Sequence, residues 1–275
     1  MDNADFQRRY EADIRPQLQE FDRKNSGRNS WGWGLLIAGA IILLLAFLKA
    51  RGGALVLFAP LPAAGILLLW LSSRSKRQCF KNILLPAVLK AKYPTLDYRP
   101  DAGIDSDIFA RARLFGSFDR YHSEDHFSGK LGATRIELAE IHAERRVQTK
   151  NNTHYQTVFQ GLMLIADCNK EFQGRTAVFP DLAERVFGSL LGRFLQNCNL
   201  LEDQAVRLED PVFEQYFSVY STDQVEARYL LSPSMMARLT ALRQRLDTNL
   251  RVLFDCNRIV IAIDLDSSWL EPPAF

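Results

Sequence analysis

Three ionisable residues at alternating positions, Glu140, His142 and Glu144, are of the types that general acid–base catalysis or metal binding would use. Apolar Ile141 and Ala143 separate them, a pattern typical of a β-strand with one polar and one apolar face. No nucleophile accompanies the three residues. The pattern therefore also fits an exposed sheet face that pairs charges or binds a ligand.

The turn after this strand predicts how the polar face is completed. If Asn151 and Asn152 form a two-residue turn, His142 lies opposite Gly161, and Glu144 lies opposite Phe159. A His over a cross-strand Gly makes a packing pocket or a shallow binding spot. The apolar residues also change parity along the strand, which predicts a β-bulge near Ala139–Glu140. The candidate binding face consists of Glu140, His142, Glu144 and Gly161.

Other polar clusters have structural explanations that compete with a function. His122 and His126 are four residues apart, but they lie in a loop-like stretch without an obvious third ligand, which favours a solvated loop over a metal site. Carboxylates at a helix start stabilise the helix dipole, which explains Asp223 and Glu226 without a function. We expect no metal and no cofactor. The secondary binding candidates are Asp119, Arg120, Glu124, Asp125, Asp223, Glu226 and Arg228.

Two apolar runs without any charged residue, 31–48 and 54–71, are the strongest signal in the sequence. As a helix, each run would cover roughly 27 Å at about 1.5 Å per residue, close to the ~30 Å hydrocarbon core of a bilayer. The short linker 49–53 requires the two helices to run antiparallel as neighbours. The sequence therefore predicts a two-helix transmembrane hairpin, with an amphipathic helical arm over 1–30 and a basic juxtamembrane helix over 72–94.

Charge around the hairpin predicts its orientation. Basic residues are frequent on both flanks and rare in the linker, so both termini should be cytoplasmic and the chain a multi-pass inner-membrane protein. The chain has a net charge of +2, but the basic residues gather beside the hairpin and the distal part is mildly acidic, which argues against nucleic acid. Lipid headgroups are expected to contact Arg74, Lys76, Arg77 and Lys81.

Residues 95–275 are long enough for one sizeable α+β domain, which we expect to contain a mainly antiparallel sheet with flanking helices. The four Cys residues of the whole chain lack metal-ligand spacing and fit free thiols in a reducing compartment. Beyond the strand above, the patterns predict a central strand, two helices and a closing hairpin: Val158–Ala166, Asp181–Gln196, Ser232–Leu246, and Leu250–Phe254 with Arg258–Ile263. Ser221 with Gln224 predicts a further short helix, capped by Ser221 and ending at Tyr229.

Five segments of the chain resemble the bacterial membrane proteins that share the domain of unknown function 3137. They are Ile14–Phe21, Phe118–Gly132, Glu140–Glu144, Phe159–Asp167 and, most distinctively, Val219–Pro233. The resemblance implies an N-terminal helix, two spans and a cytoplasmic domain. It implies no activity and no catalytic residues.

These patterns favour a membrane-anchored cytoplasmic binding or interaction module over an enzyme. Its partners would be the lipid bilayer and a membrane or cytoplasmic protein, and the hairpin would also permit homo-oligomers. The alternative is a metal-assisted or acid–base enzyme that uses the Glu140, His142 and Glu144 face.

Overall fold

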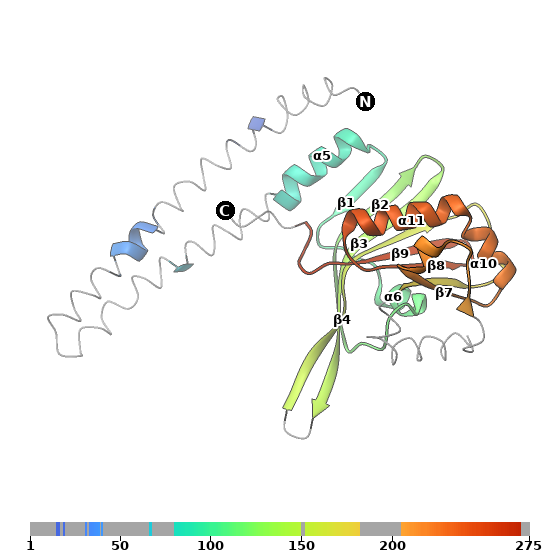
Figure 1. Cartoon of the computed structure of the whole chain (residues 1–275). Helices are drawn as coiled ribbons and strands as arrows, with labels where there is room; N and C mark the ends of the chain where they lie inside the picture. Colours follow the sequence, from blue (N-terminus) through green and yellow to red (C-terminus); the bar gives the residue numbers. More distant parts are fainter. Residues whose placement is uncertain are drawn as a thin grey trace. The chain divides into compact units, whose positions relative to one another are not determined.

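A computed structural model describes residues 80–149, 152–181 and 205–270, together with helical positions at residues 15, 16, 19, 31, 33–38, 40, 66 and 67 (Figure 1). The chain divides into two compact units, Met1–Pro94 with Leu270–Phe275, and Thr95–Trp269. Most of the predicted arm and hairpin, and nearly all of the predicted helix Asp181–Gln196, lie outside the described residues. Across the described residues, no helix is both long enough and apolar enough for a membrane span.

The first unit contains a helix with a change of pitch. A π-helical turn, η2 (Phe80–Leu84), leads directly into α5 (Leu85–Lys92). Pro86 lies in the first turn of α5 and has no N–H to donate to the preceding turn, which accounts for the wider turn before it.

Among its described residues, the second unit is organised by a nine-stranded sheet in which every strand pair is antiparallel. The strand order is β1-β2-β3-β4-β9-β8-β5-β7-β6, so the C-terminal hairpin β8–β9 lies in the middle of the sheet. The predicted antiparallel sheet with flanking helices is therefore confirmed. The strands are β1 (Leu96–Arg99), β2 (Arg120–Leu131), β3 (Thr134–Thr149), β4 (Asn152–Asp167), β5 (Thr176–Pro180), β6 (Ala205–Val206), β7 (Phe217–Ser221), β8 (Leu250–Asp255) and β9 (Arg258–Asp264).

Side chains on alternate strand positions form two apolar clusters, one on each face of the sheet. In β5, Ala177 and Phe179 belong to the first cluster, whereas Val178 between them belongs to the second. Helix α6 (Ser106–Ala112) packs on the first face through Phe109, which is 2% exposed. Helices α9 (Pro211–Glu214), α10 (Gln224–Leu230) and α11 (Pro233–Leu246) pack on the second face.

Local sequence signals locate several of these elements correctly. Helix α11 begins with Pro in its first turn and ends at Leu246, as predicted. The predicted closing hairpin matches β8 and β9. The predicted helix cap at Ser221 is wrong, because Asp223 accepts hydrogen bonds from the N–H groups of Val225 and Glu226 at 2.9 and 3.0 Å.

Two β-bulges shape the long strands, and neither lies on β3 at the predicted place. In β2, both Asp125 and His126 stand opposite Ala139, between the pairs Glu124–Glu140 and Phe127–Leu138. In β4, Val158 is the extra residue between the pairs Ala143–Phe159 and Glu144–Thr157. A bulge does occur at Ala139, as predicted, but its extra residue lies on the neighbouring strand β2, which the sequence of β3 alone does not show.

Candidate functional site

Glu140, His142 and Glu144 lie on the same side of β3, as predicted. Their neighbours Ala139, Ile141 and Ala143 are completely buried in the cluster on the first face. Because strand side chains alternate, the three ionisable residues point to the second face. The sequence thus predicts the side of the strand correctly, although it does not predict what covers this face.

The segment after β9 returns to Glu140 and binds its carboxylate. The Ser268 hydroxyl donates to Glu140 Oε2 at 3.0 Å, and the Trp269 N–H donates to the same oxygen at 3.3 Å. Burial raises the pKa of the Glu140 carboxyl above its usual value, while these two hydrogen bonds act in the opposite direction. Glu140 is 8% exposed. Its carboxylate therefore binds the segment around Ser268 and Trp269 and offers little surface to a ligand.

His142 and Glu144 differ from Glu140 in their surroundings. The His142 Nε2 atom is buried and has no hydrogen-bond partner among the residues that the structure describes. Glu144 lies opposite Arg120 on β2, and their charged groups are 3.8 Å apart. Arg120 also stacks its guanidinium over the Tyr155 ring, 3.4 Å from the centroid. His142 therefore has a buried ring nitrogen that forms no hydrogen bond with the described residues.

Gly161 has a different neighbour and a different role from those predicted. It pairs with Ile141, whereas His142 pairs with Gln160 and Glu144 pairs with Thr157. A Cβ at Gly161 would overlap the carbonyl oxygen of Ile263 on β9, and the residue has a φ of +152°. Gly161 thus permits the close approach of β4 and β9, and the predicted pairing with His142 is wrong.

The secondary candidates in β2 and in the loop before it each contact other residues of the same domain. Asp119 accepts a hydrogen bond from the Arg146 N–H at 2.6 Å, and Glu124 lies 3.7 Å from His122. Asp125, in the bulge, is fully buried with a φ of +58° and accepts a hydrogen bond from the Tyr98 hydroxyl. Burial, followed by this hydrogen bond and the Asp125 charge, raises the pKa of Tyr98.

The secondary candidates around α10 fix a loop to the helix start. Asp223 caps the helix, and the Glu226 carboxylate accepts hydrogen bonds from the N–H groups of Gln173 and Gly174 at 3.0 and 2.6 Å. Arg228 donates to the Gln224 carbonyl one turn earlier at 3.2 Å. These contacts support the structural explanation of the three residues.

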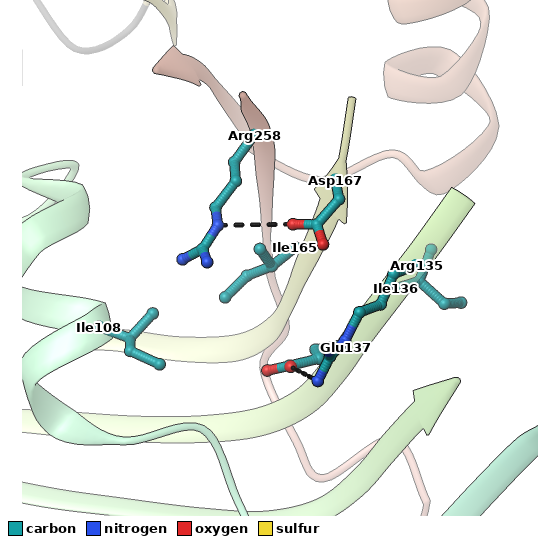
Figure 2. Close-up of a pocket in the computed structure, with 7 residues that line it drawn as sticks. All are labelled: Ile108, Arg135, Ile136, Glu137, Ile165, Asp167 and Arg258. Atoms are coloured by element: carbon teal, nitrogen blue, oxygen red, sulfur yellow. Dashed lines mark ion pairs between the residues drawn. The ribbon is translucent and has the colours of Figure 1, made fainter. Parts of the chain in front are cut away.

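A pocket of about 140 Å³ opens beside α6, at residues that sequence reasoning did not select (Figure 2). Ile108 of α6 faces two ion pairs across it: Arg258 with Asp167 at 3.4 Å, and Arg135 with Glu137 at 3.5 Å. Asp167 and Arg258 meet only because β4 pairs with β9, a contact between distant parts of the chain. The remaining lining residues are Ile136 and Ile165.

His126 lies next to Glu137, one of the residues that line this pocket. It is 7% exposed, its Nε2 is 4.0 Å from the Glu137 carboxylate, and burial lowers its pKa. No cluster of three or more His, Cys, Asp or Glu residues suited to a metal ion occurs in the described part of the chain. Of the predicted lipid contacts, Lys81 lies in η2, and Arg74, Lys76 and Arg77 lie outside the described residues.

Comparison with known proteins agrees with the family resemblance. The model of the family DUF3137, described as a protein of unknown function, matches residues 157–275 of the chain. No curated protein gives a significant match. Among solved structures, the chain is similar to the mycobacterial trehalose monomycolate transport factor A, with 10% identity, a TM-score of 0.37, and coverage of 63% of this chain and 76% of that one.

Proposed function

We propose that this chain is a membrane-anchored binding module at the bacterial inner membrane. The apolar runs 31–48 and 54–71 form a transmembrane hairpin, and the hairpin holds the sheet domain in the cytoplasm. The observation that carries the proposal is the exposure of helical apolar residues in both runs: Trp31 at 74%, Trp33 at 58%, Ile37 at 57%, Ile66 at 60% and Leu67 at 54%.

The energy of these exposed side chains favours a lipid environment. Fully burying an Ile or Leu side chain is worth about 1.5–3 kcal/mol. Leaving several such side chains in water costs a large part of the roughly 5–15 kcal/mol by which a typical domain is stable. A bilayer removes this cost, and the basic residues on both flanks of the hairpin favour the cytoplasmic side for the termini.

Binding by the domain is supported by the second face of β3. The buried Nε2 of His142 has no partner among the described residues, and buried polar atoms in folded proteins are nearly always hydrogen-bonded. A hydrogen-bonding group supplied by a bound ligand or protein would satisfy this atom. Glu144 and Arg120 beside it offer one charge of each sign to the same ligand.

Membrane fractionation tests the anchor. The full chain should stay in the membrane pellet after washes with high salt and with alkaline carbonate, which remove peripheral proteins. A variant without residues 31–71 should move to the soluble fraction and keep its sheet, as measured by circular dichroism. Release of the full chain by either wash would contradict the proposal.

Site-specific crosslinking tests the binding face in the same cells. A photoreactive residue at position 142 should give a discrete adduct, whereas the same residue at Arg238, exposed on α11, should give none. Adducts at neither position, or equally at both, would refute a partner on the β3 face.

A further inference from the structure

The β3–β4 hairpin extends beyond the rest of the sheet as a two-stranded ribbon (Figure 1). On one side, β2 begins at the pair Arg120–Glu144; on the other, β9 ends at the pair Gly161–Asp264. Residues 145–149 of β3 and 152–157 of β4 therefore pair only with each other among the described strands. We refer to these two segments as the ribbon.

Charge distinguishes the ribbon from the domain that carries it. Arg145 and Arg146 lie on the ribbon, Lys150 lies in the sequence between its two segments, and no acidic residue occurs between Glu144 and Asp167. Residues 99–275 as a whole contain more acidic than basic residues. The ribbon is therefore a local basic projection from an acidic domain.

On the β3 edge of the ribbon, a side chain accepts a hydrogen bond from the backbone. The Arg146 N–H donates to the Asp119 carboxylate at 2.6 Å, so this N–H points away from β4. Arg146 and its partner Tyr155 thus form a pair whose backbone groups both point outward. By alternation, the backbone groups of Thr153, Tyr155 and Thr157 point outward along the edge of β4. No strand pairs with that edge among the described residues.

The open edge is flanked by a cationic and aromatic surface. The Arg120 guanidinium stacks on Tyr155, which is 36% exposed, and Arg146 lies opposite Tyr155 on β3. Arginines held in this way can form bidentate hydrogen bonds with carboxylates. A third strand added to β4 would place alternate side chains beside Tyr155 and the Arg120 guanidinium stacked on it.

We propose that the β4 edge of the ribbon binds an extended acidic segment of a partner protein as an added strand. The proposal rests on the proposed function and specifies its partner. A peptide backbone can use the outward N–H and C=O groups of Thr153, Tyr155 and Thr157, whereas a lipid or a nucleic acid cannot pair with them as a strand. A short segment also contacts only the basic ribbon, while a duplex or a bilayer would extend over the acidic domain.

Peptide titration tests this proposal. The full chain in phosphatidylcholine nanodiscs is titrated into a fluorescein-labelled peptide of alternating Glu and Val, and anisotropy is measured. The matched peptide has Lys in place of Glu. The acidic peptide should bind, and its Lys counterpart should not. The double variant Arg145→Glu/Arg146→Glu should weaken binding by about tenfold or more.

Three variants separate charge from strand addition. Thr153→Pro removes an outward N–H without changing the charge, and it should weaken binding severalfold. Lys150→Glu changes the charge between the two segments in the sequence without replacing a residue of β3 or β4, so it should weaken binding even if the double variant unfolds. Arg238→Glu/Arg245→Glu makes the same charge change on the exposed surface of α11 and should leave binding unchanged.

Other outcomes overturn the proposal. They are an absence of acidic-peptide binding, an equal loss in the α11 control, or full binding by Thr153→Pro. Ribbon-dependent binding of phosphatidylglycerol vesicles or duplex DNA in preference to the acidic peptide would assign the ribbon to another partner class. Membrane retention does not use the ribbon, so anchoring and ribbon binding can fail independently.

Discussion

Replacing Gly161 by Ala tests whether this position serves the sheet or a binding pocket. An added Cβ would overlap the Ile263 carbonyl oxygen and lie 3.0 Å from the Leu265 nitrogen. The φ of +152° is also strained for any residue with a side chain, at a cost of about 1–3 kcal/mol. The variant should therefore separate β4 from β9 at this point.

The expected size follows from the contacts that would loosen. The Leu265 N–H donates to the Gln160 carbonyl on β4 at 2.9 Å. This hydrogen bond is worth about 1 kcal/mol. With the backbone strain, the free energy of unfolding should fall by about 2–4 kcal/mol, and Tm by roughly 4–16 °C.

Gly132→Ala is the matched control. Gly132 also has a positive φ, +63°, but nothing lies within 4 Å of an added Cβ. Its cost should be only the left-handed strain of about 1–2 kcal/mol. Urea unfolding of the full chain in detergent micelles, followed by circular dichroism, measures both variants. Equal losses, or a Gly161→Ala variant as stable as the wild type, would refute the sheet explanation.

Three further predictions concern buried charges and a helix cap. Burial raises the pKa of Glu140, so its stabilising contribution is present below the unfolded-state pKa and is lost as the pH rises through the folded-state pKa. Glu140→Gln should therefore have a higher Tm than the wild type at pH 7 and an equal Tm near pH 4; a constant difference across pH would contradict this. Asp223→Ala removes the cap of α10 and should cost about 0.5–2 kcal/mol in urea unfolding, and no change would refute the capping role. Arg251 is 5% exposed and its Nη1 is 2.5 Å from Asp264, so Arg251→Met should cost about 1–3 kcal/mol in the same measurement, while a stabilised variant would show that the pair opposes folding.

Local signals in the sequence predicted the parts of the fold that depend on neighbouring residues. The alternation around Ile141 predicted the side on which Glu140, His142 and Glu144 lie, and Pro233 predicted the start of α11. Both signals arise within a few residues of the chain.

The pairing of the strands depended on features that a single strand does not contain. The pairing predicted for His142 is wrong by one residue, because Thr149 pairs with Asn152 across the turn and Val158 adds a bulge in β4. The residues that donate hydrogen bonds to Glu140 are Ser268 and Trp269, 128 and 129 positions later in the chain. No local pattern connects segments so far apart in the chain. The residues that cover Glu140 could therefore not be predicted from the sequence.

The pocket beside α6 was missed for the same reason. Arg135 and Glu137 are two residues apart on β3 and could have been recognised as a pair on one side of a strand. Asp167 and Arg258 are brought together only by the pairing of β4 with β9. Because the last hairpin of the chain lies in the middle of the sheet, the sequence alone does not show which residues meet on its surface.

Cysteine labelling tests the central proposal of a membrane anchor with a cytoplasmic domain most directly. In a chain with Ser at the four native Cys positions, a single Cys at Gly52 should react with a membrane-impermeant maleimide added to intact cells. A single Cys at Ser75 should react only after the inner membrane is permeabilised. The reverse pattern would invert the orientation, and labelling of both positions in intact cells would contradict the hairpin.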